Sequence, residues 1–130
     1  MTDLLGYLAA PYSNDDKHVR LARFHAINRA AGHLMASGLY IFSPISHGHS
    51  IAEDYPLPTG FDYWRRYDAI MLGACDYLIV LTLAGWQKSV GVTSEREMMI
   101  ELKRPIFYAN DESRESLLAV KRAVTQFFEM

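Results

Sequence analysis

Two acidic residues, Glu95 and Asp68, stand where an amphipathic helix would normally carry apolar side chains. Glu95 follows a glycine-bearing loop and shares a helical stripe with Met98 and Met99, whereas Glu97 lies on a separate polar stripe. A carboxylate on the core-facing side of a helix is costly unless it is paired or used, so Glu95 is a candidate functional residue. The alternative is that Glu95 lies in the first helical turn and only stabilises the helix dipole.

Asp68 stands at the centre of a second apolar stripe. The sequence predicts a helix over residues 61–74, with Thr59 as its N-cap. The apolar stripe of this helix consists of Phe61, Trp64, Met71 and Cys75. If Asp68 faced solvent, the apolar side chains of the same stripe would have to face solvent with it. The alternative is an ion pair between Asp68 and Arg20 or Arg23 of the preceding long helix.

Two inward-facing carboxylates, with Tyr7 of the first strand nearby, suit chemistry at an anomeric carbon. One carboxylate can attack or stabilise the oxocarbenium-like centre, while the other handles the proton of the leaving group. If Asp68 and Glu95 converge on one pocket, ionising both carboxyl groups at once costs free energy, so the pKa of one of them should rise. We expect the pKa of Asp68 to rise and Glu95 to stay ionised, because Glu95 begins a helix and Asp68 lies in the middle of one.

The elements that must position these residues alternate between strands and helices along the chain. Strands are expected at Leu4–Ala10, Leu39–Phe42, Tyr77–Leu83 and Pro105–Ala109, and helices at Asn14–Ser37, at 61–74, from near Val92, and after a cap at Asn110 or Asp111. This order predicts one α/β domain over residues 1–130. Its expected form is a three-layer sandwich, with a flavodoxin-like parallel sheet of four to five strands and helices on both faces. Ligands of such sheets bind beyond the carboxyl ends of the strands.

Residues 43–60 show no helical period and carry three of the five prolines, so we expect a long loop or lid there. His47 and His49 alternate in this segment, which would place both rings on one side of an extended backbone. Such a pair suggests a metal, but no third ligand is evident. Contacts to substrate or lid, and ordinary loop histidines, are the alternatives, and we expect neither a metal nor another cofactor.

Composition excludes several classes of function. The chain has 130 residues, of which 50% are hydrophobic and 22% are charged. Its formal net charge of −2 lacks the excess of positive charge that binding to a nucleic-acid polymer or a membrane surface requires. Cys75 is the only cysteine, so an internal disulfide and a CxxC metal site are excluded. The N-terminal segment lacks the pattern of a secretory signal, and no apolar run is long enough to cross a bilayer. We therefore expect a cytoplasmic protein.

Several motifs carry a resemblance to a known family. The segments YLAAPYS, FSPISH, WxxxDxxMLxxCDxLxVL and GWxxSxGVxxExxMxxxLKRPI resemble the nucleoside 2-deoxyribosyltransferase superfamily, and most closely its small branch of phage and bacterial deoxyribosyltransferase-like domains. The resemblance covers nearly the whole chain, and its most specific part is SVGVTSE. It implies that Glu95 is the nucleophile, that Asp68 is the carboxylate near base and sugar, and that Tyr7 is the strand-end tyrosine beside the nucleophile.

The resemblance also implies contacts to substrate. A serine at position 89 is similar to the branch that hydrolyses nucleoside 5′-monophosphates, where it helps to hold the phosphate. The candidate substrate-binding residues are Ser89, Gly91, Ser13, Arg20, His47 and Trp86.

The expected function is therefore cleavage of an N-glycosidic bond, or transfer of a (deoxy)ribosyl group, on a nucleoside or nucleoside 5′-monophosphate. A nucleotide-binding or sensing module without turnover is the alternative, and a purely structural protein is a third. Two acids facing an anionic ligand favour catalysis over binding alone. The resemblance further implies a homodimer or higher even oligomer, and the expected partner is a small-molecule nucleoside or nucleotide.

Overall fold

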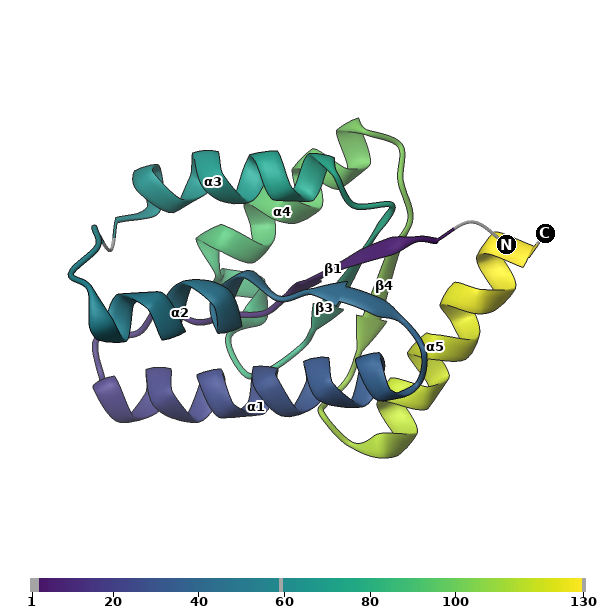
Figure 1. Ribbon diagram of the computed structural model, residues 1–130, viewed down its shortest axis with the longest axis horizontal. Coiled ribbons are helices and arrows are strands. Elements are labelled where there is room, and N and C mark those ends of the chain that lie inside the picture. The colour runs from purple at the N-terminus through teal and green to yellow at the C-terminus, as the bar shows by residue number, and fades with distance from the viewer. Residues whose placement is uncertain (1–2, 59, 130) are drawn as a thin grey trace.

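The computed structural model describes residues 3–58 and 60–129, and within them the chain forms a parallel sheet of four strands. The strands are β1 (Leu5–Ala9), β2 (Tyr40–Phe42), β3 (Tyr77–Leu81) and β4 (Ile106–Ala109), in the spatial order β2-β1-β3-β4 (Figure 1). All three pairings are parallel. The expected α/β class and flavodoxin-like sheet are thus confirmed.

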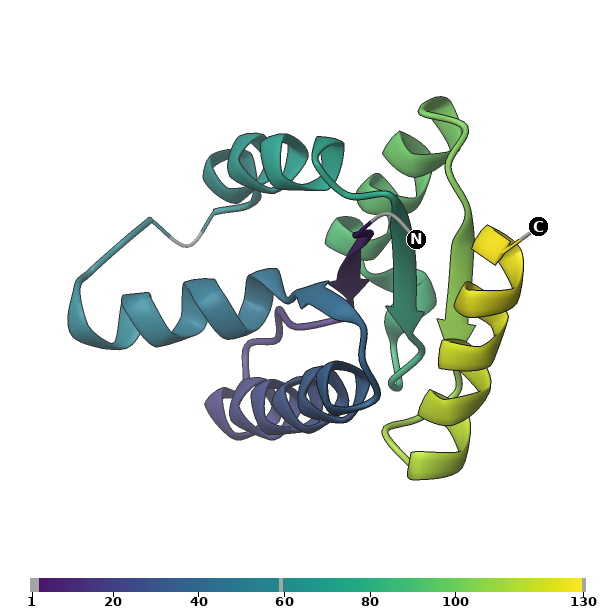
Figure 2. The ribbon, with the colours of Figure 1, turned by 45° about the vertical axis from the view of Figure 1, so that its right-hand side comes forward.

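Helices cover both faces of the sheet, which makes a three-layer sandwich (Figures 1 and 2). The helices are α1 (Lys17–Ala36), α2 (Pro44–Asp54), α3 (Phe61–Gly73), α4 (Val90–Glu101) and α5 (Arg114–Glu129), with a short 3-10 turn at Trp86–Lys88. Successive strand residues point to opposite faces. Leu8 and Ile79 therefore pack with α1 and α5, while Leu78 and Val80 pack with α3 and α4.

The chain order places a topological switch point between β1 and β3. From β1 the chain moves outward to β2, and it then crosses back over β1 to form β3 on the other side. At such a point the connections leaving the two neighbouring strands diverge and open a crevice beyond their carboxyl ends. The loops after Ala9 and after Leu81 lie at this edge of the sheet.

The expectation of a loop over residues 43–60 is wrong, because α2 occupies Pro44–Asp54. Glycine and proline lower helix propensity, which hid the helix in the sequence. Gly48 allows close packing: a Cβ atom there would lie 3.2 Å from the ring of Trp64 on α3, which is tighter than an ordinary van der Waals contact. A tertiary contact, rather than local propensity, therefore stabilises this helix.

Several helix starts differ from the expected ones. Asp16 caps α1 by accepting a hydrogen bond from the backbone N–H of His18 at 2.8 Å, so α1 begins at Lys17 rather than Asn14. Ser89 caps α4, which begins at Val90, and Glu95 therefore lies in the second turn and not the first. The cap expected at Thr59 lies outside the described residues, and Gly60 is the N-cap of α3.

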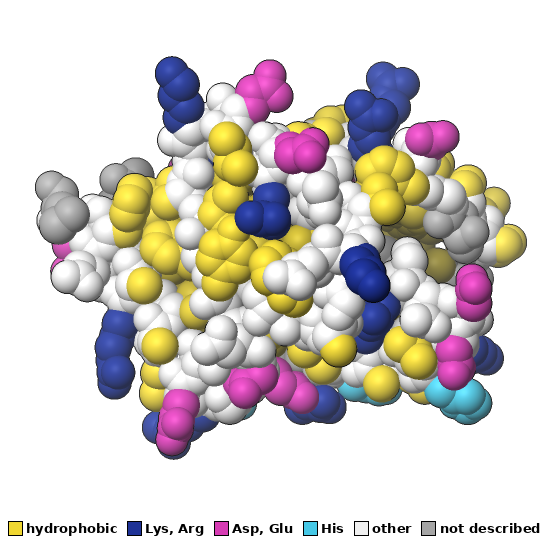
Figure 3. Space-filling view, turned by 180° about the vertical axis from the view of Figure 1, so that it is seen from behind, with side chains coloured by type: hydrophobic (Ala, Val, Ile, Leu, Met, Phe, Trp, Pro, Cys, Tyr) yellow, Lys and Arg dark blue, Asp and Glu magenta, His cyan; other side chains and the backbone are white. Residues whose placement is uncertain are grey.

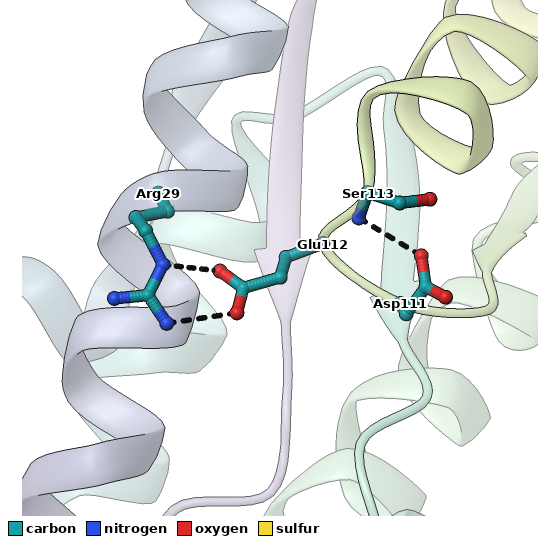
Figure 4. A network of polar contacts seen from close by, with 4 residues as sticks. All are labelled: Arg29, Asp111, Glu112 and Ser113. Carbon is teal, nitrogen blue, oxygen red and sulfur yellow. Dashed lines mark hydrogen bonds and ion pairs between the residues drawn. The ribbon is translucent and has the colours of Figure 1, made fainter.

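The segment before α5 is held by polar contacts (Figure 4). The Ser113 hydroxyl accepts a hydrogen bond from the Ser116 N–H at 3.2 Å, and the Asp111 carboxylate accepts one from the Ser113 N–H at 2.8 Å. Ser113 therefore caps the helix, in place of the expected Asn110 or Asp111. Arg29 of α1 forms a two-pronged ion pair with Glu112, but this pair is solvent-exposed and contributes little to stability.

None of the helices within residues 3–58 and 60–129 combines the length and the apolar character needed to cross a bilayer.

One buried hydroxyl gives a test of the packing. The Tyr77 ring covers Gly6, where any Cβ atom would overlap it, and the Tyr77 hydroxyl is buried without a hydrogen-bond partner among the described residues. Tyr77→Phe removes this unpaired group, so the free energy of unfolding should rise by about 1 kcal/mol. Urea denaturation measures the change, and a clear loss of stability would show that the hydroxyl has a partner.

Candidate functional site

A cleft of about 690 Å³ opens beyond the carboxyl ends of β1 and β3, at the topological switch point. Its volume is that of a site for a small molecule. One wall comes from the loop after β1 and from α2, and the other comes from α3, the 3-10 turn and α4. The charged and hydroxyl-bearing residues of its lining are Tyr12, Ser13, Arg23, Arg65, Asp68, Lys88, Ser89, Ser94 and Glu95, together with His49.

Helix α3 places Asp68 in the cleft. The N-terminal half of its apolar stripe, including Phe61 and Trp64, lines the cleft, while Leu72 in the C-terminal half is buried against the sheet. Asp68 lies at the boundary between the half of the stripe that lines the cleft and the half that packs on the sheet. The anomaly in the sequence is thus explained, because the apolar stripe marks a cleft wall as well as a core.

The ion pair considered for Asp68 does not form. Arg20 donates to the backbone carbonyls of Asn14 and Asp15. Arg23 donates to the carbonyls of Tyr12, Ser13 and Ala84 at 3.3, 3.1 and 3.0 Å. Among the described residues, Asp68 therefore faces the cleft without a salt-bridge partner.

Glu95 is buried at the base of the cleft and is bonded to the central strand. It is 9% exposed, and its Oε2 accepts a hydrogen bond from the hydroxyl of Tyr7, which is completely buried. Tyr7 lies in the middle of β1 rather than at its end, and it does not line the cleft. Burial, and then the charges of Glu95 and Asp68, raise the pKa of Tyr7, so its phenol stays protonated and donates.

Both carboxyl groups of the cleft have raised pKa values. Burial raises the pKa of Glu95 to about 8, and the charge of Asp68 adds to this while the hydrogen bond from Tyr7 opposes it. Burial also raises the pKa of Asp68 to about 6. The expected rise for Asp68 is confirmed, but the expectation that Glu95 stays ionised is wrong. Glu95 is one turn too far from the helix start for the dipole to offset its burial.

Three of the expected substrate-binding residues, Ser13, Ser89 and Gly91, line the cleft. Ser89 also has a structural role, because its hydroxyl accepts a hydrogen bond from the Val92 N–H at 3.2 Å as the cap of α4. A Cβ atom on Gly91 would meet only the Ser89 hydroxyl, at 3.9 Å. The first turn of α4 therefore leaves open space for ligand atoms, and a helix N-terminus favours an anionic group there.

The other three, Arg20, His47 and Trp86, are not part of the cleft lining. Arg20 braces its own loop, as described above. His47 lies 2.9 Å from the Tyr67 hydroxyl and joins α2 to α3. Trp86 packs beneath the guanidinium of Arg96, 5.6 Å from its ring centre. The motif GWxxSxGVxxE predicted that Trp86 binds substrate, but its side chain packs away from the cleft.

Tyr12, Arg65 and Lys88 were not singled out from the sequence, and all three line the cleft. Tyr12 could have been found from its place next to Ser13 in the loop after the first strand. Arg65 is one turn before Asp68, but the helical pattern assigned it to the solvent face. Lys88 precedes the serine cap of α4. With Arg23, these basic residues give the cleft a cationic side that can balance an anionic ligand.

The described residues contain no group of three or more His, Cys, Asp and Glu side chains that could hold a metal ion. His47 and His49 lie on a helix and contact different tyrosines, so the shared side expected from an extended backbone does not exist.

These features define an α/β protein with a flavodoxin-like sheet and a cleft, at the switch point, that holds two carboxyl groups. The chain belongs to the family described as "Domain of unknown function (DUF1937)", which matches residues 5–111. The match spans all four strands and every residue of the cleft, and it ends before α5. No curated protein matches the chain.

The buried carboxyl gives a prediction about stability. The pKa of Glu95 rises from 4.5 to about 8 on folding, so the folded state binds more protons within that window. Stability should therefore fall as pH rises from about 4.5 to 8 and should level off above. Glu95→Gln removes this titration. Above the window, the free energy of unfolding of the variant should exceed that of the wild type by a few kcal/mol. Urea denaturation across the window tests this, and parallel curves for the two proteins would contradict it.

Proposed function

We propose that this protein acts on the N-glycosidic bond of a nucleoside or nucleoside 5′-monophosphate, cleaving it or transferring the (deoxy)ribosyl group. The observation that carries the proposal is Glu95, which accepts a hydrogen bond from the buried Tyr7 and lines the same cleft as Asp68. A buried acid bonded to a phenol, in a cleft that also holds a second acid, is a costly arrangement for structure alone. It suits displacement at an anomeric carbon.

In the proposed reaction, Glu95 attacks C1′ of the sugar as the bond from C1′ to the base nitrogen breaks. The electron pair of that bond leaves with the base, which takes a proton from Asp68. Water then attacks C1′ and returns a proton to Asp68, or a second base attacks instead, and Glu95 is released. Tyr7 orients Glu95 throughout as a hydrogen-bond donor.

The lining of the cleft supports a nucleotide as the ligand. Phe61 and Trp64 offer apolar rings of the kind on which a nucleobase stacks. Lys88 and Ser89 lie at the N-terminus of α4, where a phosphate would be favoured. The resemblance of Ser89 to the serine of the monophosphate hydrolases agrees with this assignment.

The raised pKa of Glu95 favours the second candidate, a nucleotide-binding module without turnover. With a pKa of about 8, Glu95 carries its proton at neutral pH in the free protein. A protonated carboxyl is a hydrogen-bond donor and not a nucleophile. Catalysis therefore requires the proton to pass from Glu95 to Asp68 before attack.

The proposal also includes self-association into a homodimer or higher even oligomer. The surface opposite to that of Figure 1 carries a gathering of apolar side chains (Figure 3). Exposed apolar residues of α4, β4 and α5 include Ile100, Tyr108 and Phe127, at 62, 42 and 49% exposure. A partner subunit could cover such side chains.

The direct test is release of free base. Incubation with a panel of deoxynucleosides and their monophosphates, followed by chromatography, should detect base from at least one compound. Glu95→Gln keeps the shape of the side chain but removes the nucleophile, so turnover should fall at least ~10²-fold. Glu101→Gln, an exposed acid at the end of the same helix, is the matched control and should leave turnover unchanged.

Two outcomes would overturn the enzymatic assignment. A Glu95→Gln protein with nearly wild-type turnover would remove Glu95 from the mechanism. Nucleotide binding by calorimetry without release of base from any compound would support the binding module instead.

The two pKa values predict the pH profile of the reaction. The productive state needs one ionised and one protonated carboxyl, so kcat/KM should be bell-shaped, with limbs near 6 and 8. The acid limb should disappear from any residual activity of Glu95→Gln, because Gln does not titrate, while the alkaline limb should remain because Asp68 must still be protonated. A profile that is flat across this range would show that neither acid takes part.

A further inference from the structure

A second polar array lies on the cleft wall formed by the loop after β1 and by α2, and the proposed chemistry does not use it. The Tyr12 hydroxyl lies 2.5 Å from Nδ1 of His49, and Nε2 of His49 lies 2.9 Å from Oε1 of Glu53. Tyr12 and His49 line the cleft, whereas Glu53 is mostly exposed at its rim. The array thus runs from the cleft to solvent.

The ring of His49 is held in a fixed orientation. It stacks on Phe24 of α1, with ring centres 3.9 Å apart and an angle of 24° between the planes. It meets the ring of Tyr12 edge-on at 88°, and its side chain is only 14% exposed. A half-turn of the imidazole about its Cβ–Cγ bond would move Nδ1 away from the Tyr12 hydroxyl and Nε2 away from Glu53, so these two contacts fix which nitrogen faces which partner.

The partners of His49 decide where its proton lies. An ionised carboxylate can only accept a hydrogen bond, so neutral His49 facing Glu53 carries its proton on Nε2. The two atoms are at hydrogen-bonding distance but are not aligned, and Nε2 has no other hydrogen-bond partner among the described residues. Glu53 is 62% exposed, so its side chain is free to rotate into alignment.

This tautomer fixes the role of Tyr12. Because Nδ1 of His49 then has a lone pair and no proton, the Tyr12 hydroxyl must donate to it. The only groups that Tyr12 can still present to a ligand are the lone pairs of its oxygen. Tyr12 is therefore an acceptor toward the cleft.

We propose that Tyr12, oriented by His49 and Glu53, selects nucleobases that present an amino group over the corresponding oxo bases. The inference rests on the proposed function for the class of ligand. Phe61 and Trp64 line the same cleft as Tyr12, and the Trp64 ring lies against Gly48 of α2, so we place the base on these rings with its edge toward Tyr12. An amino group donates to Tyr12, whereas an oxo group places two acceptors face to face.

Binding to the Glu95→Gln protein, which prevents turnover, tests the selection. The probes are deoxynucleoside 5′-monophosphates in two matched pairs, adenine against hypoxanthine and cytosine against uracil, at a pH well above the ordinary pKa of histidine. Calorimetry should show tighter binding of the amino member by about tenfold, the value of one neutral hydrogen bond. Adding Tyr12→Phe should bring the ratio to about one.

Equal or tighter binding of the oxo members would overturn the inference, and so would a ratio that survives Tyr12→Phe. Glu53→Ala, which changes an exposed residue, should lower the ratio by releasing the tautomer of His49. Asp54→Ala, at the neighbouring exposed acid of α2, is the matched control and should leave the ratio unchanged.

A second measurement requires no ligand and no substitution. Nitrogen-15 NMR of the wild-type protein distinguishes the two tautomers of a neutral imidazole, and His49 should carry its proton on Nε2. A proton on Nδ1 would make Tyr12 a donor and would overturn the inference. Glu53→Ala should shift His49 toward the Nδ1 form, while Asp54→Ala should not.

The outcomes also separate this inference from the proposed function. A preference for amino bases without any release of base from the wild-type protein would refute the enzymatic activity and keep the selection by Tyr12. Equally efficient release from amino and oxo substrates would refute the selection and keep the enzyme. Failure of all four nucleotides to bind, together with no release of base from any compound by the wild-type protein, would refute both.

Discussion

The hydrogen bond between Tyr7 and Glu95 is the contact on which the candidate site depends, because it places a titratable acid against the central strand of the sheet. A carboxyl in this position loses most of its hydration, and only the phenol of Tyr7 offsets part of that loss. The strand order supplies the setting, since β1 lies between β2 and β3 and is covered on both faces. The rest of the fold holds the two residues together while leaving one side of Glu95 open to the cleft.

The contact between α2 and α3 gives the cleft its second wall. Gly48 allows the Trp64 ring to approach the α2 backbone, and His47 and Tyr67 join the same two helices through their side chains. Helix α2 lies between α1 and α3 (Figure 2). Without this pairing, Asp68 would face open solvent, and its pKa would have no cause to rise.

The sequence was sufficient for features that repeat along the chain and insufficient for those that depend on a single contact. Alternating strands and helices predicted the sheet, and a carboxylate on an apolar stripe marked both Asp68 and Glu95 correctly as cleft residues. Helix α2 was not predicted, because it depends on the contact between Gly48 and Trp64 of α3 rather than on the local helix propensity of its residues. The direction of a side chain could not be predicted from the sequence either. Trp86 and His47 lie in segments next to the cleft, but their side chains contact other partners.

Arg23 has a consequence for how a ligand would enter. Its guanidinium joins the carbonyls of Tyr12 and Ser13, after β1, to that of Ala84, after β3. The two loops that form the floor of the cleft are thus tied to each other before any ligand arrives. Association then carries a smaller entropic penalty, because these backbones need no further ordering. A rigid floor also means that discrimination between ligands comes from fit to an existing shape rather than from closure around the bound molecule.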